Sequence, residues 1–322
     1  MEQTSPVQTD SHDLCTLTDG HAGNVRQAQS LARALGGEPR EVVLAPRAPW
    51  RWLAPRLLPG ATRAFGSAFD HAHRQPPALA IGCGRQAALA TRLLRRRGSR
   101  VVQILDPRLD PSHWDLVIAP EHDGLAGPNV LTLLGSLNPV DDAWLANGRA
   151  AFPAFAALPS PRTAVLLGGD SGHYRFDADA FARLAMLLDD TTAHGGLLVS
   201  TSRRTPPTVI AAVRQRWARR PHAVLWCDRS DGPNPYAGLL AWADRIVCTP
   251  ESVNMVSEAC GTRVPVQVFE PDRIAGRPRR FLDALLARGR IQDLVAGPTR
   301  FDGEPLRETG RIAAEVRSRL AI

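Results

Sequence analysis

Three polar segments of this chain each follow a short apolar run and precede a stretch with helical periodicity. They span 18–24 (TDGHAGN), 168–173 (GGDSGH) and 249–258 (TPESVNMVSE). A helix N-terminus offers unbonded N–H groups and a partial positive charge, so a loop that opens a helix can hold an anion such as phosphate. Strand ending and helix capping explain each segment equally well by itself. The binding interpretation is favoured because all three segments are predicted at the carboxyl ends of strands.

The third segment has the most specific pattern. Ser252 can cap a helix that ends before Gly261, and Asn254 and Glu258 share one face of that helix because they lie four residues apart. A phosphate at the helix start leaves Glu258 about one turn deeper, where its carboxylate can accept hydrogen bonds from the hydroxyl groups of a ribose. The alternative is that Glu258 is a solvated helix residue.

Two adjacent arginines, Arg203 and Arg204, follow the neighbouring predicted strand. Their guanidinium groups suit bidentate pairing with a diphosphate, although a solvated surface explains them equally well. A chain without lysine has no P-loop, and 168–172 lacks the GxGxxG spacing, which disfavours a nicotinamide-dependent enzyme. The predicted donor- and phosphate-binding residues are Gly168, Gly169, Asp170, Ser171, Arg203, Arg204, Ser252, Val253, Asn254 and Glu258.

A histidine or carboxylate side chain at a ligand-binding sheet edge can act as a base that removes a proton from a hydroxyl group. The candidates are His21 and Asp19 in the first segment, with Glu121 as a third because it follows a predicted strand at the same sheet edge. A capping or packing role explains His21 equally well. Gly20, Gly23 and Asn24 complete this first segment.

The composition fits a globular protein of two domains. With 322 residues, 44% of them hydrophobic and 22% charged, the chain is long for one core and too apolar for a disordered protein. No apolar run reaches the roughly 18–20 residues of a membrane helix. Residues 1–13 lack the pattern of a signal or transit peptide, so we expect a cytoplasmic protein. The five cysteines have no metal-ligand spacing, which predicts reduced, buried thiols.

The net charge of +7 comes from arginine alone, because the chain has no lysine. This usage is typical of a GC-rich bacterial genome and weakens any functional interpretation of the charge. The arginines are spread over both halves without a known recognition module, so no nucleic-acid partner is expected. The acidic pairs 141–142 and 189–190 lie at predicted helix ends, and neither a metal nor a cofactor is predicted.

Apolar runs alternate with helical patterns along the chain, which predicts two α/β domains with doubly wound parallel sheets. The proline-rich linker 151–162 separates the expected domains at 13–150 and 163–296, and residues 1–12 are expected to be a disordered tail. The second sheet is expected to be complete by Val268. Expected strands cover 14–18, 41–44, 78–83, 100–105, 116–119, 130–134, 163–167, 197–200, 223–226, 245–248 and 265–268. Expected helices cover 24–35, 85–97, 141–150, 178–189, 207–219, 235–243, 252–260, 276–287 and 304–320, with one or two irregular helices over 49–74.

Several strings resemble known families. Residues 243–249 and 257–266 resemble the donor-binding half of GT-B glycosyltransferases, in which an ADxVV strand leads through a loop to a TVSE helix. Segments 19–23 and 168–172 resemble the glycine-rich loops of the enzymes that glycosylate lipid-linked peptidoglycan precursors. This resemblance implies that the loop with Gly20, Gly23 and Asn24 lies on the acceptor side. The chain from about residue 13 to 270 resembles the "elongated mitochondria" (ELM-type) mitochondrial fission family, found in bacteria and plants, through 17–24, 167–170, 234–236 and 249–259.

The resemblance implies a GT-B-like fold: two Rossmann-like domains that face a cleft, with the C-terminal helix (297–322) returning to the first. It implies a metal-independent glycosyltransferase with a nucleotide-sugar donor and a lipid-linked or cell-envelope acceptor. Glu258 matches the ribose-binding glutamate of GT-B enzymes, 252–254 match their diphosphate-facing helix start, and His21 matches a histidine of the catalytic cleft. The alternative is a non-catalytic adaptor, since plant members of the family are associated with recruiting a dynamin-related protein to mitochondria.

An anionic membrane surface is a further expected partner, reached through residues 50–58 from Trp50 to Leu58. Tryptophan, leucine and arginine together suit the headgroup boundary of a bilayer, where a ring is buried and a charged end stays wet. Docking there would make the protein peripheral on the inner membrane. The alternative is that Trp50, Leu53 and Leu57 form a stripe packed against the first sheet.

Overall fold

The computed structural model describes residues 13–294 and 303–322. The expected tail at 1–12 and nearly all of the loop at 297–303 lie outside the described residues. The chain divides into two compact units, the first formed by Met1–Pro139 with Glu308–Ile322 and the second by Val140–Arg307. Within the described part of the chain, no helix is long and apolar enough to cross a bilayer.

Six short strands form the sheet of the first unit, and every neighbouring pair is parallel. All residues of β1, β3 and β5, three of its four interior strands, are buried, the pattern of a sheet that is covered on both faces. The sheet order is β2-β1-β3-β4-β5-β6. The strands are Leu14–Thr18 (β1), Arg40–Val43 (β2), Leu79–Cys83 (β3), Arg100–Ile104 (β4), Leu116–Pro120 (β5) and Val130–Leu133 (β6).

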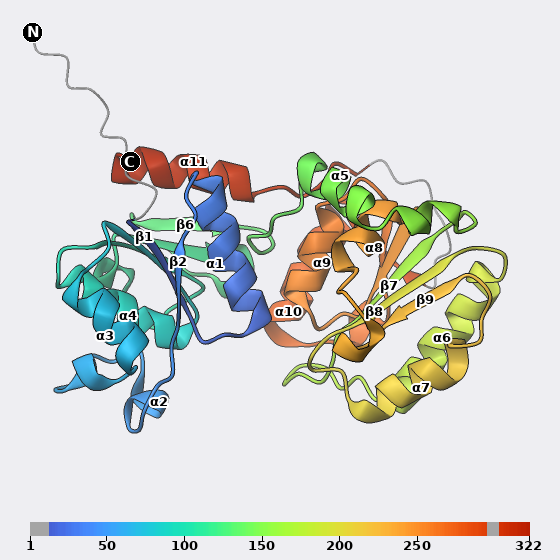
Figure 1. The fold of residues 1–322 in the computed structure, drawn as a ribbon, viewed down its shortest axis with the longest axis horizontal. Helices are drawn as coiled ribbons and strands as arrows, with labels where there is room; N and C mark the ends of the chain where they lie inside the picture. Colours follow the sequence, from blue (N-terminus) through green and yellow to red (C-terminus); the bar gives the residue numbers. More distant parts are fainter. Residues whose placement is uncertain (1–12, 295–302) are drawn as a thin grey trace, which may run out of the picture. The chain divides into compact units, whose positions relative to one another are not determined.

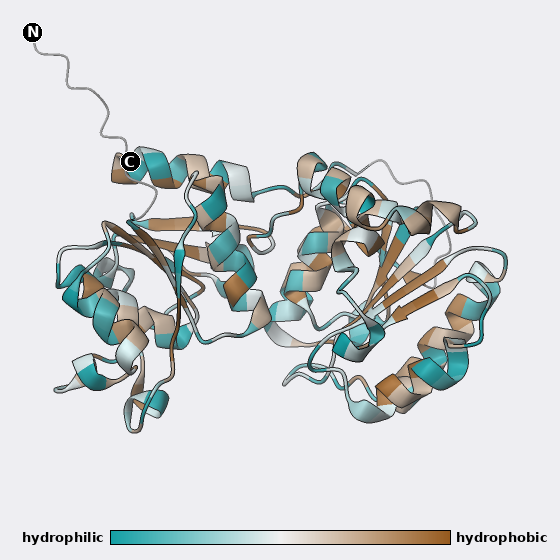
Figure 2. Cartoon of the chain, viewed as in Figure 1, coloured by the Kyte–Doolittle hydropathy of each residue, from teal (hydrophilic) through white to brown (hydrophobic). Residues whose placement is uncertain are grey.

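The side chains of these strands alternate between two helix layers. Cys15 points into a core shared with α3 (Ser67–Arg74) and α4 (Arg85–Arg95). Leu14 points to the other face, which α1 (Ala22–Ala34) covers. Figure 1 shows these helices around the first sheet, and Figure 2 shows brown, apolar strands between helices with teal outer faces.

The chain between β2 and β3 forms short, irregular helices, as expected. Residues Trp50–Leu53 make the single turn α2, and Ala61–Arg63 make a 3-10 turn before α3. None of the residues of α2 is fully buried. Helix α2 therefore lies at the surface of the first unit, whereas Phe65 and Phe69 later in this region belong to its core.

The last helix, α11 (Thr309–Leu320), returns to the first unit, as predicted. Its apolar side chains join the core beneath α1. The Glu308 carboxylate accepts the N–H groups of Leu134 (2.9 Å) and Gly135 (3.1 Å), which ties the start of the helix to the end of β6. The observed helix begins later than the expected residue 304.

The second unit also has a six-stranded sheet, and its neighbouring strands are again all parallel. The prediction that this sheet is complete by Val268 is wrong, because β12 adds a sixth strand beside β11. Strand β12 consists only of Gln292 and Asp293, so no apolar run marks it in the sequence. In the sheet order β12-β11-β10-β7-β8-β9, the strands are Thr163–Leu167 (β7), Leu197–Thr201 (β8), Ala223–Trp226 (β9), Arg245–Cys248 (β10), Val266–Val268 (β11) and Gln292–Asp293 (β12).

The division of the chain lies earlier than the expected linker at 151–162. Helix α5 belongs to the second unit, where it packs on α8 so closely that a Cβ at Gly148 would lie 2.6 Å from the carbonyl oxygen of Ala237. Figure 1 shows α6 and α7 on one face of the second sheet and α8 and α9 on the other. The helices are Asp142–Ala151 (α5), Ala178–Thr192 (α6), Pro207–Trp217 (α7), Tyr236–Trp242 (α8), Val253–Cys260 (α9) and Gly276–Ala287 (α10).

Candidate functional site

The strand order reverses once in each sheet, and ligands of doubly wound sheets bind at the carboxyl edge where this happens. In the first unit the reversal lies between β1 and β3, and in the second it lies between β7 and β10. The loops after these four strands therefore flank two candidate sites. The segments 18–24, 168–173 and 249–258 follow β1, β7 and β10, so all three lie where ligands are expected.

Asp19 organises the loop after β1. Its Oδ1 accepts the backbone N–H of His21 (3.1 Å) and the side-chain amide of Asn24 (2.9 Å), and it also pairs with His21 Nδ1 at 3.1 Å. Gly20 has a φ of 78°, in the left-handed region, and a Cβ there would lie 3.2 Å from Val43, so glycine suits this turn. The His21 side chain is 79% exposed, and its Nε2 is the nitrogen that Asp19 does not hold.

Helix α1 begins earlier than predicted. His21 is its N-cap, so Gly23 and Asn24 lie in the first helical turn instead of a loop. The side-chain oxygen of Asn24 accepts a hydrogen bond from Cys83 Sγ (3.6 Å) at the end of β3. Burial raises the pKa of the Cys83 thiol well above its usual value, and the Asp19 carboxylate raises it further. Cys83 therefore keeps its proton and links the two loops of this switch point, a role that no sequence pattern indicated.

Glu121 lies at the same sheet edge, but three strand positions away from β1. It follows β5 and begins a 3-10 turn over Glu121–Asp123. Neighbouring strands are about 4.8 Å apart, so the ends of β1 and β5 are separated by about 14 Å. The structure brings Asp19 and His21 together and leaves Glu121 apart from them.

The glycine N–H groups at the end of β7 are bonded to the loop after β10. Gly168 donates to Thr249 Oγ1 and Gly169 donates to Glu251 Oε1, both at 2.8 Å. A Cβ on Gly168 would lie 1.5 Å from Glu251 Oε1, and a Cβ on Gly169 would lie 2.1 Å from the carbonyl oxygen of Arg204. Glycine is needed at both positions because the loops after β7, β8 and β10 approach one another closely here. Their N–H groups are engaged inside the protein rather than presented to a phosphate.

Helix α9 begins as predicted. Ser252 is its N-cap, and the Ser252 hydroxyl accepts the N–H of Met255 at 3.4 Å. Val253 and Asn254 form the first turn and are half-exposed. The start of α9 therefore lies at the switch point with its positive dipole end toward the sheet edge.

Glu258 lies one turn deeper on α9, and the interpretation of it as a solvated residue is wrong. It is 2% exposed, and its Oε2 accepts a hydrogen bond from the Tyr236 hydroxyl at 2.5 Å. Tyr236 begins α8 and is the last residue of the string 234–236. The carboxylate is therefore held in a fixed orientation by a residue whose role the sequence did not indicate.

The remaining predicted donor residues fall into two groups. Asp170 and Ser171 fold their loop onto itself, because their side chains accept backbone N–H groups six and three residues further on. Arg203 and Arg204 are exposed, and neither guanidinium forms an ion pair or hydrogen bond within the residues that the structure describes. Only the arginines therefore keep unbonded cationic groups at this sheet edge.

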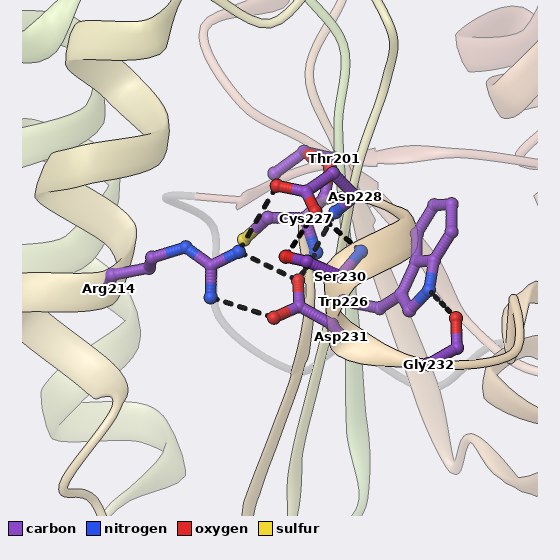
Figure 3. A network of polar contacts seen from close by, with 8 residues as sticks. All are labelled: Thr201, Arg214, Trp226, Cys227, Asp228, Ser230, Asp231 and Gly232. Atoms are coloured by element: carbon purple, nitrogen blue, oxygen red, sulfur yellow. Dashed lines mark hydrogen bonds and ion pairs between the residues drawn. The ribbon is translucent and has the colours of Figure 1, made fainter.

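A polar network braces the carboxyl end of β9 (Figure 3). Arg214 of α7 pairs with Asp231 (2.8 Å) and Asp228 (3.3 Å), and Asp231 also accepts the N–H of Cys227 (2.7 Å). The Arg214 guanidinium holds the pKa of the Asp231 carboxyl below its usual range. These residues bond mainly to one another, so the network stabilises the edge of the sheet.

No group of three or more histidine, cysteine, aspartate or glutamate side chains gathers around a possible metal position in the described ranges. The five cysteines are free and buried, in agreement with the sequence prediction.

Two Rossmann-like parallel sheets define the class: the protein has a GT-B-type fold. UDP-GlcNAc 2-epimerase from Neisseria meningitidis, solved with UDP-GlcNAc, superimposes with a TM-score of 0.59 at 12% identity and covers 96% of this chain and 99% of its own. The calicheamicin glycosyltransferase CalG4 superimposes with a TM-score of 0.50 at 12% identity, over 96% of this chain and 99% of its own. At such identities the likeness shows the fold alone.

The chain belongs to the mitochondrial fission ELM1 family, whose model matches residues 22–320. Mitochondrial fission protein ELM1 of Arabidopsis thaliana is 29% identical over 276 residues, which are 76% of this chain and 64% of the plant protein. The match therefore spans less than two thirds of the plant protein. An uncharacterised protein of Rickettsia prowazekii, RP120, is 24% identical over 358 residues, covering 96% of this chain and 99% of its own. The family identified from the sequence is confirmed.

Proposed function

We propose that this protein is a metal-independent glycosyltransferase that takes a sugar from a nucleotide-sugar donor. The observation that carries the proposal is the exposed His21 imidazole held by the Asp19 carboxylate at a sheet switch point. The second unit adds a helix start at Ser252 and the oriented Glu258 at its own switch point. A fold neighbour solved with UDP-GlcNAc supports a nucleotide sugar as the ligand class.

In this proposal the second unit binds the donor. The N-terminus of α9 and the unbonded guanidinium groups of Arg203 and Arg204 offset the negative charge of the diphosphate, both in the donor and as it leaves. Glu258 accepts hydrogen bonds from the ribose while Tyr236 keeps its carboxylate in place. This arrangement needs no divalent cation, because helix dipole and arginine supply the positive charge.

In the first unit, His21 is the proposed base. Asp19 holds His21 Nδ1, so Nε2 carries the lone pair that can accept a proton. The acceptor hydroxyl gives its proton to Nε2 as its oxygen forms a bond to the anomeric carbon of the sugar. The bond from that carbon to the diphosphate breaks, and the nucleoside diphosphate leaves with the bonding electrons. We propose a lipid-linked or cell-envelope saccharide as the acceptor.

Donor binding is tested by replacing Glu258 with alanine. The wild type is first screened by thermal shift against UDP, GDP, CMP and ADP sugars, and one of these classes is expected to raise its melting temperature. For that donor, Glu258→Ala is expected to weaken binding roughly ten- to a hundredfold, because a hydrogen bond to a charged group contributes about 1.5–3 kcal/mol. Calorimetric titration measures the change in Kd.

Two further variants show whether a loss of binding is specific. Tyr236→Phe removes the hydroxyl that holds Glu258 and should cause a smaller loss in the same direction. Glu315→Ala changes an exposed glutamate of α11 and should bind like the wild type. Unchanged donor affinity in Glu258→Ala would refute the assignment of that residue.

A non-catalytic adaptor is the second candidate, because the family is named for mitochondrial fission. An adaptor needs no nucleotide sugar, whereas a transferase must bind one, so the thermal-shift screen separates the two. If a donor binds, the products distinguish transfer from rearrangement of the donor. A transferase releases nucleoside diphosphate as acceptor is glycosylated, and an epimerase returns an intact nucleotide sugar.

We also propose that α2 and the residues after it dock the protein on an anionic membrane. Trp52 is 65% exposed and Leu58 is 38% exposed, whereas Trp50 and Leu57 pack partly against the first core. Exposed arginines at 51 and 56 lie beside them in the sequence. The Arg85 guanidinium donates to the backbone carbonyl oxygen of Trp52 (3.3 Å), so the segment is held against α4.

Membrane docking predicts that the protein co-sediments with anionic vesicles at low salt. Trp52→Ala should weaken this binding about tenfold or more, because burial of a large side chain contributes about 1.5–3 kcal/mol. The electrostatic part should fade at about 1 M salt, where the Debye length falls to about 3 Å. Met186→Ala removes an equally exposed apolar side chain from the second unit and serves as the control. Absence of co-sedimentation at low salt would exclude the docking site.

A further inference from the structure

Glu251 is a buried carboxyl group between the two loops at the switch point of the second unit. It is 5% exposed and directly precedes Ser252, the N-cap of α9. Its Oε1 accepts the N–H of Gly169 at 2.8 Å and the hydroxyl of Thr249 at 3.0 Å. Its Oε2 is also buried, and it has no hydrogen-bond partner among residues 13–294 and 303–322. A buried polar atom without a partner is costly, so this oxygen points to a group that joins it in the functional state.

The surroundings favour the neutral form of this acid. A carboxylate with one bare, buried oxygen has a large desolvation cost, and both donors of the neighbouring loops are on the other oxygen. Arg204 is the cation that stabilises the charged form of Glu251 electrostatically, but its guanidinium is exposed and is not bonded to Glu251. Burial outweighs the hydrogen bonds and raises the pKa of Glu251 above its usual value.

A neutral carboxylic acid has one O–H donor, and here the proton belongs on Oε2. The partner that completes the site must therefore be an acceptor. The first turn of α9 and the unbonded guanidinium groups of Arg203 and Arg204 favour an anionic one. We propose that Glu251 donates a hydrogen bond from Oε2 to a phosphate oxygen of the nucleotide bound by the second unit. This inference rests on the proposed function. Glu251 is then a direct contact of the diphosphate, in addition to Glu258 at the ribose.

Three other titratable or charged groups face Glu251. They are Arg204 from the loop after β8, Tyr174 from the loop after β7 and Cys248 at the end of β10. Burial raises the pKa of Tyr174 and of Cys248, so both stay neutral from acidic to neutral pH. Arginine stays cationic over the same range. Glu251 is the one of these four groups whose charge changes there.

The proposal fixes the sign of a pH effect. As the pH rises through the pKa of Glu251, the donor proton is lost and a negative charge remains beside the phosphate. Affinity for the anion therefore falls with rising pH. Glu251→Gln keeps the size of the side chain and an N–H donor but cannot ionise, so its affinity should not show this fall.

The experiment is a calorimetric titration of wild type, Glu251→Gln and Glu251→Ala with inorganic pyrophosphate and with UDP across acidic to alkaline pH. From the acidic to the alkaline end, the affinity of the wild type relative to Glu251→Gln is expected to fall roughly ten- to a hundredfold. The ligands' own ionisation affects both proteins alike, so this ratio isolates Glu251. Glu251→Ala should bind weakly at every pH. Glu270→Gln is the matched control, because an Arg183 pair holds the pKa of Glu270 below its usual value, so Glu270 loses its proton before Glu251 does as the pH rises.

Each outcome of the titration either supports or overturns the proposed hydrogen bond from Glu251. A ratio that does not change with pH, or a Glu251→Gln variant as weak as Glu251→Ala, would overturn the proposal, since the carboxylate would then be an acceptor or a purely structural group. If the wild type binds pyrophosphate with the expected ratio but binds no nucleotide or nucleotide sugar, the proposed function fails while the anion contact of Glu251 stands. If it binds neither probe at any pH, both fail. Melting temperatures of the variants show whether they are folded.

Discussion

Replacing His21 with alanine is expected to lower the rate of sugar transfer by about 10²- to 10⁴-fold, the usual contribution of a general base. Affinity for the nucleotide should stay nearly unchanged, because the residues assigned to the donor all belong to the second unit. The rate is measured as release of nucleoside diphosphate from the donor that stabilises the wild type, with a lipid-linked saccharide as acceptor. Asp19→Asn should cause a smaller loss, since the amide can still contact His21 but carries no charge to stabilise the imidazolium.

The control for this prediction is His71→Ala, which removes an exposed histidine of α3 in the same unit. It should transfer sugar at the wild-type rate. Equal rates for the His21 variant and the wild type would rule out His21 as the base. A parallel loss of donor affinity would instead indicate that His21 binds substrate.

Removal of residues 308–322 is expected to unfold the first unit and leave the second folded. The deletion takes away Ile312, Val316 and Leu320, which are 0%, 0% and 9% exposed in the core beneath α1. Burial of each such side chain contributes about 1.5–3 kcal/mol, so the loss is on the order of 5 kcal/mol or more. That is comparable to the whole free energy of unfolding of a typical domain, about 5–15 kcal/mol.

Hydrogen exchange with mass spectrometry reads the two units separately. Peptides from 13–139 should lose protection in the truncated protein, while those from 140–294 should keep it. Glu315→Ala, on the solvent side of α11, should leave both sets of peptides protected. Retained protection of 13–139 after the deletion would show that α11 is not needed for the first core.

The fold was largely predictable because both sheets are buried on both faces. Strands such as β5 and β7 are short, mostly apolar runs followed by polar loops, and this signal depends little on tertiary context. The domain boundary was not predictable in the same way. Prolines at 151–162 suggest a linker, but α5 before them already packs on α8 through Gly148, and such a contact leaves no local pattern.

The sequence predicted which loops form the candidate site, but it did not predict the contacts between the residues of those loops. Residue type and spacing identified the segments that hold Asp19, His21 and Glu258. Sequence could not show that the N–H groups of Gly168 and Gly169 are bonded to Thr249 and Glu251, because those partners lie more than eighty residues away along the chain. The roles of Tyr236, Cys83 and Glu251 were missed because they depend on contacts with residues 22, 59 and 82 positions away along the chain. The sequence signal available for Glu251 was an acidic residue directly before the predicted helix cap at Ser252.

The discontinuous first unit sets an order of events during protein synthesis. Residues 13–139 leave the ribosome early, but the face of their sheet beneath α1 is complete only when α11 arrives, and α11 is synthesised after the whole of the second unit. The whole of 140–307 is synthesised in between and contains all the strands of its own sheet. The second unit can therefore finish folding first. Until α11 is made, residues 13–139 have apolar side chains such as Leu14 and Leu31 incompletely covered. During translation that surface would have to be shielded until residues 309–320 have emerged from the ribosome.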